Sequence, residues 1–236
     1  MPQSFTTTRY LVQNSEWPAN GRHILGHHDA NSVIVYQAYK PSIGHYAAKH
    51  QKFTGAPDFS ATRMTWIKPN FLWMMYRNGW GVKRDQEVTL AVRLKRSFFE
   101  ELLATAVPST FVEALYGDRE TWKMAVERSD VRLQWDPDHG PTGKKMVRRA
   151  IQLGMRGEMA ARYASGEEIV SIEDVSEFVE QQRVFAMEHR WEELEVPTET
   201  EFVVGDEDVN ARLGIGIIEQ DGEGIKTLDE KLERVV

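Results

Sequence analysis

The stretch Arg63–Trp80, RMTWIKPNFLWMMYRNGW, decides how this chain folds, because it holds three of the seven tryptophans in an almost unbroken apolar run. Residues 64–67 favour a pleated surface, so we expect a short buried strand there. Pro69 has the fixed φ that opens a helix, and the apolar residues after it leave no polar face, which predicts a helix buried on most sides. Asn78-Gly79 ends this helix, with Gly79 as its left-handed cap.

Two cations, Lys68 and Arg77, flank this apolar block. Long basic side chains can lie over aromatic rings and still reach water with their charged ends. Alternatively, one of the two binds an anionic ligand. The sequence leaves both interpretations open.

Outside this stretch, further strands stand out. Residues 32–39, SVIVYQAY, are β-branched and aromatic, which predicts a buried strand. We expect another at 131–135, VRLQW, ended by Asp136-Pro137. Strands and helices alternate irregularly, which favours a single mixed α+β domain with a central, largely antiparallel sheet over a doubly wound parallel sheet.

The composition excludes several classes of protein. Hydrophobic residues make up 41% and charged residues 28% of the 236, as in globular proteins. The sequence contains no apolar run of about 18 residues, so we expect no membrane-spanning helix. Its N-terminus lacks the charged and apolar regions of a signal peptide. Without cysteine there is no disulfide or thiol chemistry, so we expect a cytoplasmic protein, with a nuclear location left open.

Charge divides the chain unevenly. Residues 1–165 carry 23 Lys and Arg against 15 Asp and Glu, whereas residues 166–236 carry 6 against 21. This asymmetry fits a basic body that binds phosphate-rich ligands and an acidic tail that solvates the protein or covers the basic face. We expect a domain at residues 1–198 and an acidic, partly disordered C-terminal appendage at residues 199–236.

Four motifs give the chain a family resemblance: VIVYQAY, RMTWIKPNFLWMMYRNGW, VRLQWDPDH and RAIQLGMRGE. In order and wording they resemble the family of domains of unknown function DUF4291, over roughly residues 22–172. The resemblance implies family membership and brings no activity with it.

The order of elements is also similar, in outline, to the ADP-ribosyltransferase fold. That resemblance implies NAD as a substrate, held by the first strand and by a Ser or Thr on the second, with a catalytic Glu on a later strand. Here the later strand has Gln134 and Asp136 instead, and a carboxylate is needed there to stabilise oxocarbenium-like charge. The catalytic candidates are therefore Asp136 and Glu158. The NAD-binding candidates are Tyr36, Gln37, Arg63, Thr65, Lys68, Gln134 and Arg149.

A noncatalytic module that binds a nucleotide or RNA is the alternative. Base stacking contributes about 1 to 3 kcal/mol per base, so two exposed tryptophans would suffice. The stacking candidates are Trp66, Trp73, Trp80 and Trp135, of which Trp66 and Trp73 lie in the most apolar stretch and equally suit a core. The phosphate-binding candidates are Arg63, Lys68, Lys83, Arg84, Lys144, Lys145, Arg148 and Arg149.

Other motifs predict less. GPTGKK at residues 140–145 lacks the spacing and the final Ser or Thr of a phosphate-binding Walker loop. His23, His27 and His28 have no further ligand at convincing spacing, so we predict no metal site.

Overall fold

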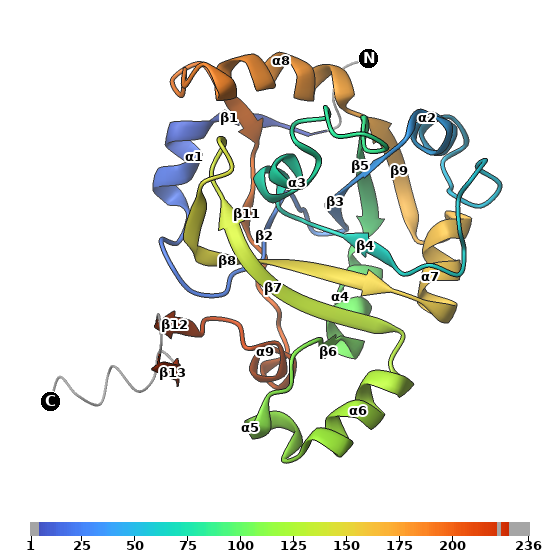
Figure 1. The fold of residues 1–236 in the computed structure, drawn as a ribbon, viewed down its shortest axis with the longest axis vertical. Coiled ribbons are helices and arrows are strands. Elements are labelled where there is room, and N and C mark those ends of the chain that lie inside the picture. The colour runs from blue at the N-terminus through green and yellow to red at the C-terminus, as the bar shows by residue number, and fades with distance from the viewer. Residues whose placement is uncertain (1–4, 221–222, 227–236) are drawn as a thin grey trace, which may run out of the picture.

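The structure is a computed structural model that describes residues 5–220 and 223–226 (Figure 1). Its first sheet is antiparallel, with β3 (Ser32–Tyr39) paired along its whole length to β5 (Val88–Lys95), and β5 paired in turn to β9 (Ile169–Asp174). Both faces of this sheet are buried, which explains the continuous apolar run in β3. Val33 and Val35 belong to one hydrophobic core, whereas the alternating Ile34 and Tyr36 belong to another.

A second sheet has the order β4-β8-β7-β6, and its long strands run steeply across the direction of the first sheet (Figure 1). All its pairs are antiparallel except β6 with β7. The strands are β4 (Thr65–Ile67), β8 (Lys145–Met155), β7 (Val131–His139) and β6 (Val107–Pro108).

Strand β7 is longer than expected, since Asp136-Pro137 does not end it. Pro137 pairs with Arg149 of β8, and the partner on the other side, β6, reaches only to Leu133. A proline is tolerated here because no third strand needs its missing amide hydrogen. The consequence is that Asp136 lies within a strand.

The two sheets meet where β3 passes the end of β4. The amide of Tyr36 donates to the carbonyl of Lys68 at 2.7 Å, and the two residues form an isolated antiparallel bridge. Farther along, the amide of Ile34 donates to the carbonyl of His27. These contacts cover the outer side of β3, the last strand of its sheet, so this apolar strand is not left as an open edge.

Helix α3 (Phe71–Asn78) is the helix predicted after Pro69, although it begins two residues later than Pro69. The side chain of Asn70 accepts from the amide of Trp73 at 2.8 Å and is the N-cap. Gly79, with φ 61°, ends the helix in the predicted left-handed conformation. The helix packs on β3, β7 and β10 (Glu195–Pro197).

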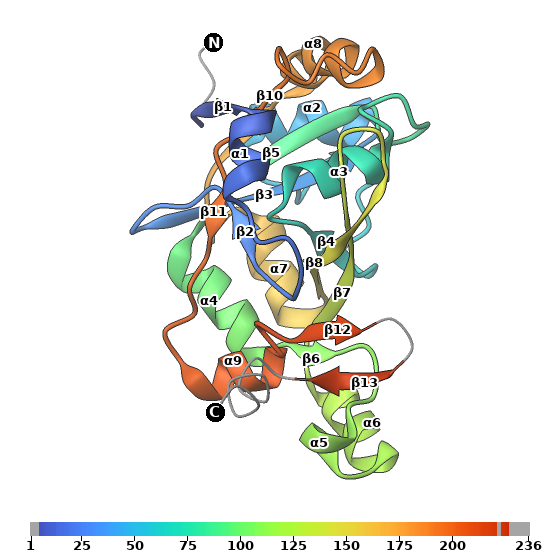
Figure 2. The same ribbon diagram turned by 90° about the vertical axis from the view of Figure 1, so that its left-hand side faces the viewer.

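The remaining helices surround the sheets (Figures 1 and 2). Helices α2 and α4 pack on β3 and β5, and α8 packs on β5. Their bounds are α1 (Tyr10–Glu16), α2 (Pro41–His50), α4 (Arg96–Thr105), α5 (Glu113–Tyr116), α6 (Arg119–Arg128), α7 (Gly157–Ser165), α8 (Ser176–Met187) and α9 (Glu207–Leu213). The structure is therefore the mixed α+β fold, with mainly antiparallel sheets, that the sequence predicts.

The segment after residue 194 returns across the molecule beside the N-terminal segment (Figure 2). Strand β10 pairs with β1 (Thr7–Arg9), and β11 (Thr200–Glu201) pairs with β2 (Leu25–Gly26). Glu199, Phe202 and Leu213 are buried. Residues 199–213 thus pack on the body of the molecule.

A hairpin of β12 (Ile218–Gln220) and β13 (Glu223–Lys226) follows. The predicted domain boundary at residue 198 stays a prediction. The disorder predicted for the acidic segment falls in part on residues 221–222 and 227–236, which lie outside the described residues.

Candidate functional site

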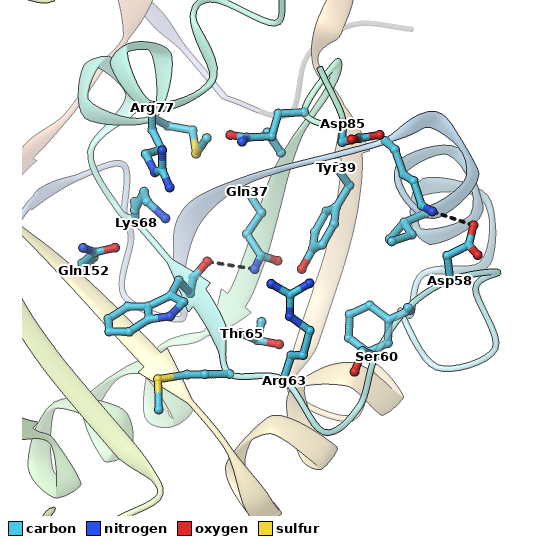
Figure 3. Close-up of a pocket in the computed structure, with 18 of the residues that line it drawn as sticks. Gln37, Tyr39, Asp58, Ser60, Arg63, Thr65, Lys68, Arg77, Asp85 and Gln152 are labelled. Atoms are coloured by element: carbon cyan, nitrogen blue, oxygen red, sulfur yellow. Dashed lines mark hydrogen bonds and ion pairs between the residues drawn. The ribbon is translucent and has the colours of Figure 1, made fainter. Parts of the chain in front are cut away.

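A cavity of about 770 Å³ lies beside the junction of the two sheets (Figure 3). It is lined from β3 and α2, from the chain between α2 and α3, from α3 itself, from the loop between α3 and β5, and from β7 and β8. The lining residues are Gln37, Ala38, Tyr39, Lys40, Ile43, Asp58, Phe59, Ser60, Arg63, Met64, Thr65, Trp66, Lys68, Met74, Arg77, Asp85, Gln86, Gln134 and Gln152. A cavity of this size accommodates a ligand as large as a nucleotide or dinucleotide.

Gln37 is fixed in the wall by hydrogen bonds from both ends of its amide group. Its Nε2 donates to the carbonyl of Trp66 at 2.9 Å, and its Oε1 accepts from the hydroxyl of Tyr163. The next inward residue on β3, Tyr39, packs on Phe53 and Phe59, and burial raises the pKa of its hydroxyl. This wall is rigid and holds a neutral phenol and an oriented amide.

Besides Lys40, which pairs with Asp58, three cations reach the cavity from different positions: Arg63 from the loop before β4, Lys68 from the end of β4 and Arg77 from α3. Figure 3 shows Arg63 beneath Gln37 and Arg77 above Lys68. In the part of the chain that the structure describes, neither arginine makes a hydrogen bond or an ion pair, and both residues are exposed. Unpaired guanidinium groups at a cavity suit a phosphate or carboxylate ligand.

Lys68 is buried, with 6% of its surface exposed, and its Nζ lies 5.0 Å from the centre of the Trp73 ring. Burial, and then the positive charge of Arg77, lower its pKa to about 7, while the charge of Asp136 acts in the opposite direction. The interpretation that Lys68 extends to bulk water is therefore wrong. Its amine is held against the aromatic block and faces the cavity instead.

The opposite wall is a row of polar side chains on the β7–β8 pair. Gln134 and Asp136 are two residues apart on β7 and so share a face. Nε2 of Gln152, on β8, donates to Oε1 of Gln134 at 2.7 Å and to Oδ2 of Asp136 at 2.6 Å. Burial raises the pKa of Asp136, opposed by the Gln152 hydrogen bond and by the charges of Lys68, Arg149 and Arg77.

The structure thus brings together Gln37, Arg63, Thr65, Lys68 and Gln134 as lining residues, whereas Asp136 does not line the cavity itself but accepts a hydrogen bond from Gln152 of its wall. Arg149 does not line the cavity, but its charge acts on Asp136. Tyr36 is fully buried on the opposite face of β3, with its ring centre 5.4 Å from that of Phe71. Alternation along the strand turns Gln37 to the cavity and Tyr36 away from it.

Glu158 also lies apart from the cavity. It is exposed in the first turn of α7, where its amide donates to Oδ2 of Asp130 at 2.9 Å. A carboxylate in a first helical turn interacts favourably with the helix dipole, which gives this residue a structural role. Of the two predicted carboxylates, only Asp136 contacts the cavity wall.

Several lining residues were not predicted as site residues: Tyr39, Phe59, Ser60, Gln86, Gln152 and the ion pair of Lys40 with Asp58 at 2.7 Å. Gln152 was open to prediction, because it lies opposite Gln134 in the β7–β8 pairing. Asp58, Phe59 and Ser60 come from the loop between α2 and β4, and Gln86 comes from the loop between α3 and β5; neither loop has a regular pattern. Tyr39 ends β3, and Lys40 is the N-cap of α2.

Two of the four stacking residues proposed for RNA are buried, and the other two are half-buried. Trp73 and Trp80 are buried, and Nε1 of Trp80 donates to the carbonyl of Pro141 at 2.9 Å. Nε1 of Trp135 donates to the carbonyl of Leu213, whereas Trp66 is half-buried and lines the cavity. Arg148 is buried in an ion pair with Asp138 and is not free to bind a phosphate.

Two further observations concern the described residues alone. Within residues 5–220 and 223–226, no group of three or more His, Cys, Asp or Glu side chains is arranged to hold a metal ion. Two of the three histidines considered in the sequence have other partners: Nδ1 of His23 lies 2.6 Å from Oε1 of Glu201, and Nδ1 of His27 lies 2.9 Å from the carbonyl oxygen of Thr198. Over the same residues, no helix is both long enough and apolar enough to cross a membrane.

Comparison with known proteins identifies one family. The chain matches the family described as Domain of unknown function (DUF4291) over residues 23–202, about three quarters of its length. This match confirms the resemblance seen in the four sequence motifs. No curated protein matches the chain.

Proposed function

Since the chain belongs to the DUF4291 family, whose activity is unknown, we propose a function from the cavity itself: it binds an anionic ligand of dinucleotide size, with NAD as the first candidate, and transfers ADP-ribose from it. The observation that carries the proposal is the convergence of Gln37, Lys68 and Gln134 on one cavity, with the carboxyl group of Asp136 bonded to its wall.

Each part of NAD has a matching surface in the cavity. Arg63 and Arg77 are unpaired and suit the two phosphates, and Lys68 adds positive charge when it is protonated. Tyr39, Phe59 and Trp66 provide rings that suit a base or the nicotinamide. The amides of the three lining glutamines on β3, β7 and β8 suit ribose hydroxyl groups.

Asp136 is the residue we assign to the chemical step. In the transfer, the bond from ribose C1 to the nicotinamide nitrogen breaks, its electron pair stays on that nitrogen, and an acceptor nucleophile bonds to C1. The ionised carboxylate of Asp136 stabilises the oxocarbenium-like charge at C1 as that bond breaks. Its hydrogen bond from Gln152 and the nearby cations favour the ionised form.

Calorimetric titration with NAD tests the binding. We expect saturable binding that weakens at least tenfold in the double variant Arg63→Met and Arg77→Met, because both phosphate partners are lost. Arg84→Met is the matched control, since Arg84 is exposed and does not line the cavity. No saturable NAD binding, or equal affinity in the double variant, would overturn the assignment of NAD.

Asp136→Asn then separates an enzyme from a binding module. We expect it to retain NAD binding within a few-fold and to lose the release of nicotinamide. If wild type binds NAD but releases no nicotinamide with any acceptor or with water, the noncatalytic alternative replaces the transferase. An RNA-binding function would have to rest on the half-buried Trp66 and Trp135 with exposed basic residues such as Lys144 and Lys145. Salt-sensitive RNA binding without NAD binding would favour it.

A further inference from the structure

Lys68 differs from the other buried cations of the molecule. Arg148 is paired with Asp138, and Arg132 donates to backbone carbonyls. Lys68, in contrast, has neither a hydrogen bond nor an ion pair within residues 5–220 and 223–226, and its Nζ lies 5.0 Å from the centre of the Trp73 ring. When this amine is neutral, its lone pair is available, because no hydrogen-bond donor of the described residues engages it.

The position of Lys68 is fixed by the backbone. Its carbonyl accepts from the amide of Tyr36, and it directly precedes Pro69, whose ring restricts the conformation of the residue before it. Its amine lies against the Trp73 ring on one side and adjoins the cavity on the other. Figure 3 shows it in the cavity wall between Arg77 and Gln152.

The surroundings favour a neutral amine. Desolvation and the adjacent Arg77 disfavour the ammonium form, so the pKa falls to about 7 and much of the amine is unprotonated at neutral pH. The charged groups that act on it are Arg77 from α3 and Asp136 from β7. Lysines that are desolvated or placed beside a second cation are the ones that serve as nucleophiles in proteins.

We infer that Lys68 forms an imine with an aldehyde or ketone that also carries a phosphate group, bound in this cavity. Nζ adds through its lone pair to the carbonyl carbon, the carbon–oxygen bond breaks, and the oxygen leaves as water with the two protons that the amine loses. Arg77, next to the amine, binds the phosphate. The step needs no oxidant or reductant, and it is reversed by water.

This inference shares the cavity with the proposed function but does not require that NAD be the ligand. The Trp73 ring and the buried wall exclude part of the water that would hydrolyse an imine. The unpaired Arg63 and Arg77 favour phosphorylated over neutral carbonyl compounds. The chemical class is therefore a phosphorylated aldehyde or ketone small enough for about 770 Å³.

Pyridoxal 5′-phosphate is a suitable probe, because it has an aldehyde and a phosphate on one ring. The folded protein is incubated with it at pH 7 and reduced with borohydride, and the modified lysines are located by peptide mass spectrometry. We expect Lys68 to be modified at least tenfold faster than Lys83, which is exposed in the loop after α3. We also expect pyridoxal, which lacks the phosphate, to modify Lys68 at least tenfold more slowly.

Variants complete the test. Lys68→Met should abolish the fast modification, Lys83→Met should leave it unchanged, and Arg77→Met should reduce the preference for the phosphorylated probe. Should Lys68→Met fail to fold, the comparison of Lys68 with Lys83 within the wild-type protein still decides the outcome. Modification of Lys68 no faster than that of Lys83 overturns the inference, as does equal reactivity toward pyridoxal.

Titration of the same protein sample with NAD keeps the two proposals apart. Fast modification of Lys68 without NAD binding supports imine formation and rules out NAD as the ligand of the cavity. NAD binding with no preferred modification of Lys68 supports the proposed function and overturns the imine.

Discussion

The two sides of helix α3 hold buried charges in opposite ways. At its N-terminus, Glu199 accepts from the amide of Phe71 at 2.7 Å and from Nδ2 of Asn70 at 3.4 Å, while nearby Asp138 and Arg148 pair with each other at 2.5 Å. On the cavity side, Lys68 is also buried, yet no carboxylate pairs with it within the described residues.

The contrast separates ionisable groups that stabilise the fold from ionisable groups that can bind a ligand. A buried charge is tolerated when its hydrogen bonds and its counter-charge are supplied by the protein. Where the protein supplies neither and a cavity adjoins, a bound ligand can supply both. We call Glu199, Asp138 and Arg148 the closed cluster. Removing the ion pair of this cluster should lower stability, whereas mutations of the cavity wall should weaken ligand binding without lowering stability.

The largest expected effect is the loss of Asp138. Asp138→Ala leaves Arg148 buried without its counter-charge, which should lower the free energy of unfolding by about 3–5 kcal/mol. Urea denaturation measures this, with Glu193→Ala as the control, because Glu193 pairs with Arg190 at 2.6 Å on the surface. That exposed pair should contribute less than about 1 kcal/mol. An equal loss in the free energy of unfolding of the two variants would contradict the distinction between buried and exposed ion pairs.

Replacing Lys68 should act in the opposite direction. Lys68→Met exchanges a buried, unpaired amine for an apolar side chain of similar length, so at pH 6 we expect a gain of about 1–4 kcal/mol in the free energy of unfolding. The same variant should lose ligand binding. Urea denaturation gives the first result and calorimetry the second, and Lys83→Met serves as the exposed control.

The gain from Lys68→Met should also depend on pH. The pKa of Lys68 is lowered from 10.5 to about 7 in the folded protein, so between these values the unfolded chain binds more protons. Wild-type stability therefore rises with pH across this window, and the advantage of the variant should shrink by up to about 1.4 kcal/mol per pH unit between pH 7 and 9. A constant difference over this range would contradict a neutral amine.

The smallest expected effect at low pH belongs to Glu199. Burial raises its pKa well above 4.5, so the carboxyl group is protonated in the folded protein at mildly acidic pH. Glu199→Gln, which also places a neutral group there, should change the free energy of unfolding by about 1 kcal/mol or less at pH 5.

Raising the pH should then separate wild type from Glu199→Gln. Because the folded-state pKa lies above the unfolded value, the stability that Glu199 contributes is complete below pH 4.5 and is lost as pH rises. We expect wild type to fall behind the variant between pH 5 and pH 8 in urea denaturation, with exposed Glu207→Gln as the control. A difference that does not change with pH would mean that Glu199 is ionised throughout.

Much of the fold could be predicted from local patterns. The strand at residues 32–39 and the cap at Gly79 follow from β-propensity and from the need for a positive φ, both of which are local properties. These are features that a few adjacent residues determine. Thr65 and Gln134 are expected near one site because of the outline resemblance to the ADP-ribosyltransferase fold, and Lys68 because it flanks the apolar block.

The rest depends on contacts between distant parts of the chain. Which of Tyr36 and Gln37 faces the cavity depends on which sheet face packs on α3, and Asp136-Pro137 continues a strand only because β6 is short. Glu199 lies in an acidic segment whose composition suggests solvent, yet its carboxyl group meets the amide of Phe71, 128 residues earlier. Composition does not encode such a pairing.

The contact between Glu199 and helix α3 also affects the order in which the protein can mature during its synthesis. Every residue that lines the cavity lies between positions 37 and 152, so the ribosome completes the lining long before it adds residue 199. Until then the first amide of α3 lacks its carboxyl partner, and β1 lacks β10. The nascent chain therefore contains every residue that lines the cavity before it contains Glu199 and β10, which contact α3 and β1.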